Sequence, residues 1–278
     1  MRFVPIALAT AALLGASTPG VQAGLSTCAQ TIAYKLTNVF EYGDQDLHYD
    51  YCEHIQGGRG YASGIAGFTT GTGDAIQVLK EFDRLAGDKN DLNKFEGVIE
   101  KLSDQDSDDV EGLDGYCGAW KKLGKDSTKF QEAQRNIRDK LYSKIAADHA
   151  SKLGLKLAIT QAQLYDAIVQ HGEGNEEDSL NWLINETNKS FDSDKTGDSG
   201  STLTINGKKV DEIVWLINFL DNRYDNLWDP SDVANKEAWR DTIGRVESYQ
   251  FIARKKQYNW DKEITALDNE GKEIKLSC

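Results

Sequence analysis

Hydrophobic residues recur along most of this chain with the helical period of about 3.6 residues. Residues 28–41 place Ile32, Leu36 and Phe40 on one face, and this predicts an amphipathic helix with Glu41 at its C-terminal end. Comparable patterns predict further helices at residues 75–86, 91–102, 127–152, 155–171, 178–190, 210–228 and 235–256. The chain is therefore expected to be mainly α-helical.

Two segments break the helical pattern in ways that predict β-structure. Residues 57–73 are too rich in glycine for an ordinary helix or strand. Glycine lets a ligand approach the backbone closely, so we expect a β-ribbon that lines a cleft. Leu203 and Ile205 alternate with polar residues up to an Asn-Gly pair at residues 206–207, which is the signal of a type I′ hairpin. Residues 104–118 are acidic and are expected to form a loop.

The N-terminus predicts secretion. Residues 1–23 begin with a basic residue, continue with an apolar stretch and end in small residues, as cleaved signal peptides do. The apolar stretch is too short to span a bilayer, and no later stretch is long enough. We therefore expect a soluble, extracellular protein without membrane attachment, in which residues 24–278 form one two-lobed domain that acts as a monomer.

The four cysteines are expected to form two disulfides in that oxidising compartment. Three pairings are possible. Cys28 and Cys278 lie at the two ends of the mature chain, and a bond between them would leave Cys52 to pair with Cys117. No Cys or His spacing typical of a zinc site is present in the sequence, so we expect no metal ion and no cofactor.

Charge narrows the choice of partners. The chain carries 45 Asp and Glu residues against 32 Lys and Arg residues, a net charge of −13. Nucleic acid is not expected as a partner, because phosphate binding needs a basic surface. A polycationic substrate would be attracted by such a field, although an acidic surface also serves solubility alone.

Three motifs in order point to one family. The first runs from Gly58 to Asp74 as Gly-Arg-Gly-Tyr-x-x-Gly-Ile-x-Gly-Phe-x-x-Gly-Thr-Gly-Asp, the second is the helical segment from Phe130 to Tyr142, and the third reads Tyr-Asp-Ala-Ile-Val-x-His-Gly from Tyr165. Together they resemble the glycoside hydrolase family 46 chitosanases. The resemblance implies a mainly α (α+β), lysozyme-like fold with two helical lobes, a small β-ribbon beside the catalytic cleft, and one catalytic domain over residues 24–278.

The resemblance also implies a reaction. Family 46 enzymes cleave the β-1,4 bonds of chitosan, a cationic glucosamine polymer, with inversion, so chitosan or a related polysaccharide is the expected partner. The family's general acid, a Glu that closes the first long helix, falls on Glu41. A general acid must be protonated at working pH, and the apolar neighbours Val39 and Phe40 favour this.

The positions that hold the attacking water depart from the family pattern. The family uses an Asp just before Gly-Arg-Gly and a nearby Thr, whereas this chain has Gly57 and Ala62 there. The remaining candidates for the second group are Asp44, Asp46, Asp50, Glu53 and His54. Among them we expect Glu53 or Asp46 to act with Glu41. Carboxyl groups about 6.5–9.5 Å apart would indicate inversion and about 5–5.5 Å retention, which the sequence leaves open.

Six further residues match the family. Asp74 is expected to bind a glucosamine ammonium through a charge-assisted hydrogen bond, or to cap the helix that begins beside it. Arg59 and Tyr51 are expected to contact the sugar. The same resemblance implies a buried ion-pair network behind the catalytic Glu, made of Asp166, Arg223 and Arg245. This network is expected to orient Glu41 and to tune it electrostatically.

Two other functions remain open. Gly57 and Ala62 also suit a catalytically weakened polysaccharide-binding protein that descends from such an enzyme. The third possibility is a hydrolase or lyase that acts on another polysaccharide with a relocated base.

Overall fold

The computed structural model describes residues 24–55, 59–87, 90–105, 107–233 and 236–278. The predicted signal peptide, residues 1–23, lies outside the described residues, and so does Gly57. Within these ranges, no helix is both long enough and apolar enough to cross a membrane.

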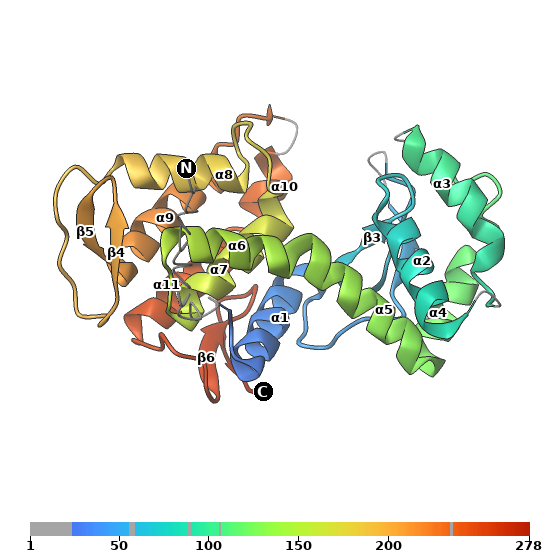
Figure 1. The fold of residues 1–278 in the computed structure, drawn as a ribbon, viewed down its shortest axis with the longest axis horizontal. Helices are drawn as coiled ribbons and strands as arrows, with labels where there is room; N and C mark the ends of the chain where they lie inside the picture. The colour runs from blue at the N-terminus through green and yellow to red at the C-terminus, as the bar shows by residue number, and fades with distance from the viewer. Residues whose placement is uncertain (1–23, 56–58, 88–89, 106, 234–235) are drawn as a thin grey trace, which may run out of the picture.

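Two lobes of unequal size lie at either end of one long helix (Figure 1). The small lobe consists of β1 (Cys52–His54), β2 (Tyr61–Ser63), η1 (Gly64–Ala66), β3 (Phe68–Thr69), α2 (Asp74–Ala86), η2 (Asn93–Phe95), α3 (Glu96–Asp104), α4 (Tyr116–Asp126) and α5 (Thr128–Arg138). The large lobe consists of α1 (Thr27–Tyr42), α6 (Lys144–Leu153), α7 (Ala158–His171), α8 (Leu180–Lys189), β4 (Thr202–Ile205), β5 (Lys208–Asp211), α9 (Glu212–Trp228), α10 (Lys236–Arg240), α11 (Gly244–Arg254), β6 (Ile264–Leu267) and β7 (Glu273–Leu276). A π-helical turn, η3 (Asp139–Ser143), joins α5 to α6. The expected mainly α, two-lobed fold is confirmed.

Each lobe has its own hydrophobic core, and this explains why the chain divides in two. Trp215 and Trp260 are fully buried in the large lobe, whereas Trp120 and Phe130 pack edge to face in the small lobe, with ring centroids 4.8 Å apart. Leu47, on the segment between α1 and β1, packs against both cores. The lobes therefore meet at this segment as well as along the long helix.

Helix α1 carries Glu41 in its last turn and ends where the sequence predicts. Ser26 caps the N-terminus by accepting a hydrogen bond from the backbone N–H of Ala29 at 3.2 Å. At the other end Gly43 adopts a left-handed conformation with φ of 85°, which glycine reaches without strain. The termination directs the following segment away from the helix axis, across the junction between the lobes (Figure 1).

The glycine-rich ribbon is an antiparallel sheet of order β1-β2-β3, in which Glu53 lies opposite Ala62. A Cβ atom added to Gly64 would lie 2.2 Å from Oε1 of Gln134 in α5, and one added to Gly71 would lie 2.4 Å from the carbonyl oxygen of Ser107. At these positions, close packing against the chain itself excludes a side chain. The sequence had suggested a different reason for the glycines, namely the close approach of a ligand to the backbone.

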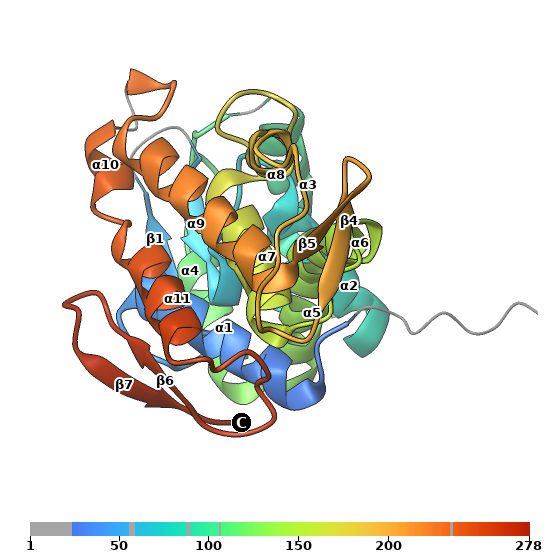
Figure 2. The ribbon, with the colours of Figure 1, turned by 90° about the vertical axis from the view of Figure 1, so that its left-hand side faces the viewer.

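Several elements differ from the sequence expectations. The hairpin at residues 206–207 is present between β4 and β5, with positive φ at both turn residues as a type I′ turn requires. The predicted loop at 104–118 gives way to α4 from Tyr116, and the helix predicted at 235–256 is broken into α10 and α11. The hairpin β6-β7 was not predicted; it packs along α11 and reaches α1 (Figure 2).

Both disulfides have the expected partners. Cys28 bonds to Cys278 with the Cα atoms 4.9 Å apart. Cys52 bonds to Cys117 with the Cα atoms 5.3 Å apart, and this ties β1 to α4. The first bond joins the two ends of the described chain, and the second stabilises the ribbon of the small lobe.

Candidate active site

Glu41 lines a cavity of about 180 Å³ where α1 and α7 of the large lobe meet the ribbon of the small lobe. We refer to it as the Glu41 cavity. It is lined by Thr37, Asn38, Glu41, Tyr42, Tyr51, Ala62, Ile65, Ala66, Gly67, Tyr165 and Val169. The side chain of Glu41 is 39% exposed, and its carboxylate is ion-paired to Arg245, a residue of α11 that is almost completely buried.

A buried network extends behind this pair. Asp166 of α7 lies between two arginines, 2.7 Å from Nη1 of Arg223 and 3.4 Å from Nε of Arg245. Its other carboxylate oxygen accepts a hydrogen bond from the Thr37 hydroxyl at 3.0 Å. Burial alone would raise the pKa of Asp166, but the charges of Arg245 and Arg223 outweigh it and hold the pKa below its usual value. Asp166 therefore stays ionised and fixes both guanidinium groups.

His171 closes the far end of the network, a role that the sequence did not assign. Its Nε2 accepts a hydrogen bond from Nε of Arg223 at 3.0 Å. The proton must then reside on Nδ1, which donates to the carbonyl oxygen of Asp178 at 2.9 Å. Burial, together with the charge of Arg223, holds the pKa of His171 well below 6.5. The imidazole is consequently a neutral acceptor that orients Arg223.

Asp74 is the first residue of α2 and organises the turn before it. Its Oδ1 accepts hydrogen bonds from the backbone N–H of Thr69 at 2.8 Å and from the Thr72 hydroxyl at 2.9 Å. Burial raises the pKa of Asp74, and these hydrogen bonds oppose the shift. Among the described residues, none donates to Oδ2. One carboxylate oxygen is thus structural, and the other remains available to a ligand.

Tyr142, in the π-helical turn, is within electrostatic reach of both Asp74 and Glu41. Burial raises the pKa of its hydroxyl to about 12, and the negative charges of Asp74 and Glu41 add to the shift. Arg59, whose side chain is exposed, acts on the same hydroxyl in the opposite direction. The Tyr142 hydroxyl makes no hydrogen bond to any described residue. The sequence placed Tyr142 on the long helix but gave no sign that it faces these groups.

The register of the ribbon places Glu53 on the same sheet face as Ala62, because directly opposed residues project to one side. Ala62 lines the Glu41 cavity. Tyr51 lines the same cavity. The pKa of its hydroxyl is raised, first by burial and then by the charge of Glu53 and a hydrogen bond to that residue. Tyr51 and Glu53 therefore form a pair at the ribbon side of the cavity.

Asp46, the alternative to Glu53, lies elsewhere. It lines a separate cavity of about 720 Å³ that is bordered by α1, residues 45–50 and α5. Its backbone carbonyl accepts a hydrogen bond from the Asn38 side chain at 2.6 Å and so fixes the segment after α1. Neither Glu53 nor Asp46 lines the Glu41 cavity itself, and of the two only Glu53 lies on the ribbon face whose Ala62 does.

The lobed helical fold and a carboxylate ion-paired to a buried arginine in the inter-lobe cavity together define a lysozyme-like glycoside hydrolase. The sequence model of Glycosyl hydrolase family 46 matches residues 35–262. The chitosanase of Bacillus subtilis (strain 168) is 38% identical over 248 residues, covering 89% of this chain and 85% of that protein.

Solved structures agree with this match. The crystal structure of the native chitosanase of Bacillus subtilis MY002 covers 91% of this chain and 100% of its own at 35% identity, with a TM-score of 0.78. The complex of a Gynuella sunshinyii family 46 chitosanase with chitotetraose covers 91% of this chain and 98% of its own at 29% identity, with a TM-score of 0.77. The chain belongs to glycoside hydrolase family 46.

Proposed function

We propose that this protein is a chitosanase that cleaves β-1,4 bonds within chitosan or a closely related glucosamine polysaccharide. The observation that carries the proposal is Glu41, which lines the inter-lobe cavity and is ion-paired to the buried Arg245. The similar proteins described above are chitosanases, and one of them binds chitotetraose. The net charge of −13 would attract a cationic polymer to the cleft.

Residues 24–278 would act as one secreted catalytic domain. The disulfide between Cys28 and Cys278 supports this, because it joins the first helix to the end of the last strand. Two disulfides also suit an oxidising, extracellular compartment. We also propose that the protein acts as a monomer.

Glu41 would act as the general acid. It donates its proton to the glycosidic oxygen as the bond between that oxygen and the anomeric carbon breaks. Arg245, held from behind by Asp166, then stabilises the carboxylate that results. Water adds to the anomeric carbon and must lose a proton to a base on the opposite side of the sugar ring.

Glu53 would supply that base. A methyl group at Ala62 cannot hold the water, and Asp46 lines a different cavity. The Glu53 carboxylate lies on the ribbon face of Ala62 and accepts a hydrogen bond from Tyr51. We therefore assign to Glu53, with the Tyr51 hydroxyl, the role that Asp and Thr fill in the family pattern.

The remaining assigned residues would bind the polymer. The free oxygen of Asp74 suits a glucosamine ammonium. Arg59 and Tyr51 would contact sugar hydroxyls, and Tyr142, which is within electrostatic reach of Asp74 and Glu41, would contact the sugar near the cleaved bond.

Turnover of chitosan by the purified mature protein tests the proposal through the release of new reducing ends. Glu41→Gln should lower kcat by about 10²–10⁴-fold, the usual contribution of a general acid. Glu53→Gln should cause a comparable loss, which Gly57→Asp should partly restore. Glu111→Gln, the same change at an exposed acidic loop position, should leave kcat unchanged. Undiminished turnover in Glu41→Gln would refute the mechanism.

Ala62 also favours a second function, that of a polysaccharide-binding protein with little catalysis. In that case chitosan would bind to the protein without the release of reducing ends. Any turnover that depends on Glu41 excludes this alternative. Cleavage of a different polysaccharide, with no action on chitosan, would instead indicate an enzyme of the same fold with another substrate, and NMR of the first products would then identify its stereochemistry.

A further inference from the structure

A second cavity lies away from the site described above. It has a volume of about 720 Å³, within the usual range for ligand pockets of about 300–1,000 Å³. None of its lining residues lines the Glu41 cavity. We refer to it as the junction cavity, because its walls come from both lobes.

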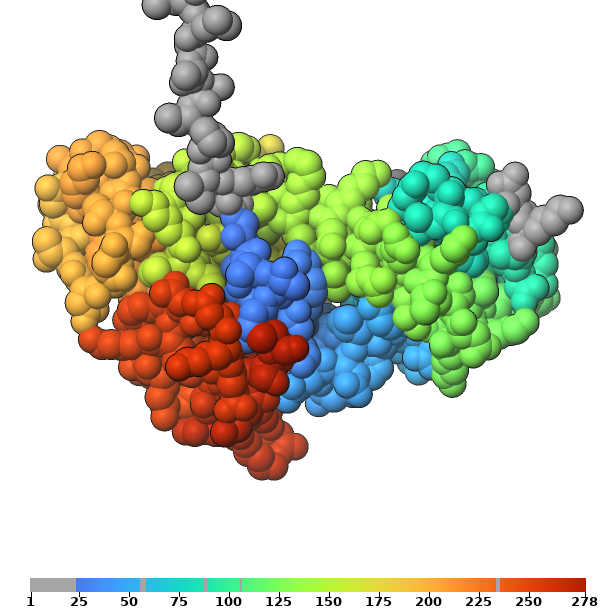
Figure 3. Space-filling view, turned by 60° about the horizontal axis from the view of Figure 1, so that its bottom comes forward, coloured from blue at the N-terminus to red at the C-terminus, as the bar shows by residue number. Residues whose placement is uncertain are grey.

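The junction cavity touches the two chain connections that join the lobes. One wall is α1 of the large lobe, another is residues 45–50, and the third is the end of α5 with the first residue of the π-helical turn. Figure 3 shows α1 in blue and the following segment in light blue at the waist of the molecule, next to the yellow-green long helix. A ligand in this cavity would contact both lobes at once.

Fixed hydrogen bonds hold the walls in place. The Arg138 guanidinium stacks on the Tyr34 ring, 3.5 Å from its centroid, and the Tyr34 hydroxyl donates to Oδ1 of Asp139 at 2.8 Å. Arg135 donates to the Tyr49 hydroxyl at 2.9 Å. Polar groups are therefore presented in set positions, which lowers the entropic cost of binding.

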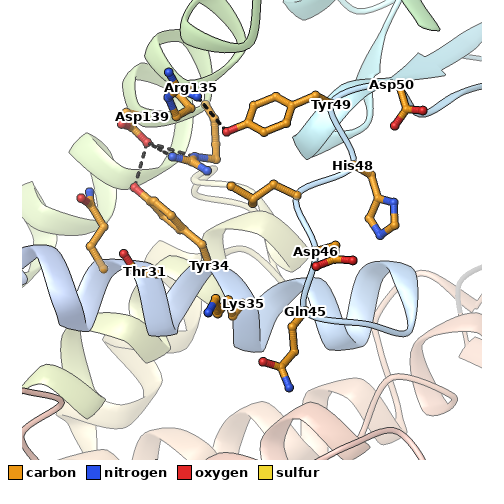
Figure 4. Close-up of a pocket in the computed structure, with 13 residues that line it drawn as sticks. Thr31, Tyr34, Lys35, Gln45, Asp46, His48, Tyr49, Asp50, Arg135 and Asp139 are labelled. Atoms are coloured by element: carbon orange, nitrogen blue, oxygen red, sulfur yellow. Dashed lines mark hydrogen bonds and ion pairs between the residues drawn. The ribbon is translucent and has the colours of Figure 1, made fainter. Parts of the chain in front are cut away.

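The charges in the cavity are of both signs, and some lack a charged partner. Asp46 and Asp139 lie on opposite sides of the cavity (Figure 4). Within the described residues, the Asp46 carboxylate has no hydrogen bond or ion pair, and the bonds to Asp139 all fall on Oδ1. Lys35 and Arg135 supply N–H donors, and neither is ion-paired to a described carboxylate.

This combination selects one class of ligand. An anion would be repelled by Asp46 and the outer oxygen of Asp139, and a simple polyamine would be repelled by Lys35, Arg135 and Arg138. A ligand that carries both ammonium groups and hydroxyl acceptors satisfies the two sets together. Glucosamine sugars have this composition.

We propose that the junction cavity binds a short glucosamine oligosaccharide, the product class of the reaction, as a second, non-catalytic site. The choice of ligand rests on the proposed function, whereas the site itself rests on the cavity. Because both lobes form its walls, occupancy would favour one arrangement of the lobes, and the cleft and the cavity would affect each other's affinity reciprocally.

Calorimetric titration with glucosamine trisaccharide tests the proposal in full-length mature protein that carries Glu41→Gln, so that no ligand is consumed. Thr31→Trp fills the cavity from an α1 position on its wall. Thr27→Trp places the same side chain one turn earlier on α1, at an exposed position outside the cavity, and is the matched control. The fully N-acetylated trisaccharide and inorganic phosphate are the comparison ligands.

We expect two binding events in the Glu41→Gln protein and in its Thr27→Trp form, and one in the Thr31→Trp form. The N-acetylated sugar and phosphate should give no event that Thr31→Trp removes. Identical trisaccharide titrations for the two tryptophan variants would overturn the site, and an event for phosphate or the N-acetylated sugar that Thr31→Trp removes would overturn the ligand class. With Glu41 intact, Thr27→Trp should cleave chitosan at the initial rate of the unmodified protein. Absence of turnover in both proteins contradicts the proposed function, and the titrations still report on the cavity.

Discussion

The carboxylate of Asp166 provides a direct test of how the buried network is stabilised. Asp166→Asn preserves the shape of the side chain but removes its charge, leaving Arg223 and Arg245 buried with only Glu41 as a counter-charge. Removing one partner of a buried ion pair costs about 3–5 kcal/mol of folding free energy. We expect a loss in this range at neutral pH, together with a lower kcat because Arg245 is no longer held.

The loss should depend on pH in a defined direction. The pKa of Asp166 is lowered in the folded protein, so its stabilising contribution is fully present above the unfolded-state pKa of about 3.9 and disappears as the pH falls through the folded-state pKa. The difference in unfolding free energy between the unmodified protein and Asp166→Asn should therefore be constant above about pH 5 and should narrow below about pH 4.

Urea unfolding with the disulfides intact, followed by circular dichroism at about pH 7 and about pH 2.5, measures both quantities. Asp148→Asn is the control, since Asp148 forms an exposed ion pair with Lys144 at 3.0 Å, and its loss should cost less than about 0.5 kcal/mol. A loss below about 1 kcal/mol for Asp166→Asn at neutral pH, or an equal loss at both pH values, would refute the reasoning.

Three further changes test other parts of the structure. His171→Phe should cost about 1–3 kcal/mol by leaving a buried N–H of Arg223 unpaired, and His171→Gln, which retains an acceptor, should lose less. The pKa of His171 is lowered in the folded protein, so the free energy of unfolding of the unmodified protein should decline as the pH falls below about 6.5. Melting experiments over a range of pH should show a smaller decline for His171→Phe and His171→Gln than for the unmodified protein. Replacing Cys28 and Cys278 together by Ser should lower the free energy of unfolding by about 2–5 kcal/mol, because the unfolded chain gains conformational entropy without the cross-link. Calorimetry should show this loss as a lower Tm. Glu212→Ala should cost about 3 kcal/mol or more in urea unfolding, because two backbone N–H groups of the α6–α7 loop and a buried serine hydroxyl lose their acceptor; an unchanged midpoint would contradict this.

Local sequence patterns predicted the fold where helices are amphipathic or capped. The α1 helix, with Leu36 on its buried face and Gly43 after its end, follows from periodicity and capping alone. The α4 helix was missed because its large buried residues are only two, Tyr116 and Trp120, with a glycine between them and an acidic stretch before them. The π-helical turn within the long helix arises at the junction between two cores, which no local pattern encodes.

The candidate site was predictable to different extents. The motifs placed Glu41, and the structure brings it into contact with Arg245, a residue 204 positions away in the chain. The choice between Glu53 and Asp46 depends on strand register and on the path of residues 43–51, and these are set by long-range packing. His171 belongs to the third sequence motif, but only the fold shows that it accepts a hydrogen bond from Arg223.

The disulfide between Cys28 and Cys278 makes the stretch of chain between them a closed ring in the covalent sense. Cys28 lies in the helix that carries Glu41, and Cys278 follows the last strand. A single cut at an exposed turn, such as Asn206-Gly207 at the tip of β4-β5, would leave every segment between Cys28 and Cys278 attached to the helix that carries Glu41. A circularly permuted gene with its new ends at that turn, and a short linker in place of the original ends, should therefore encode the same three-dimensional enzyme.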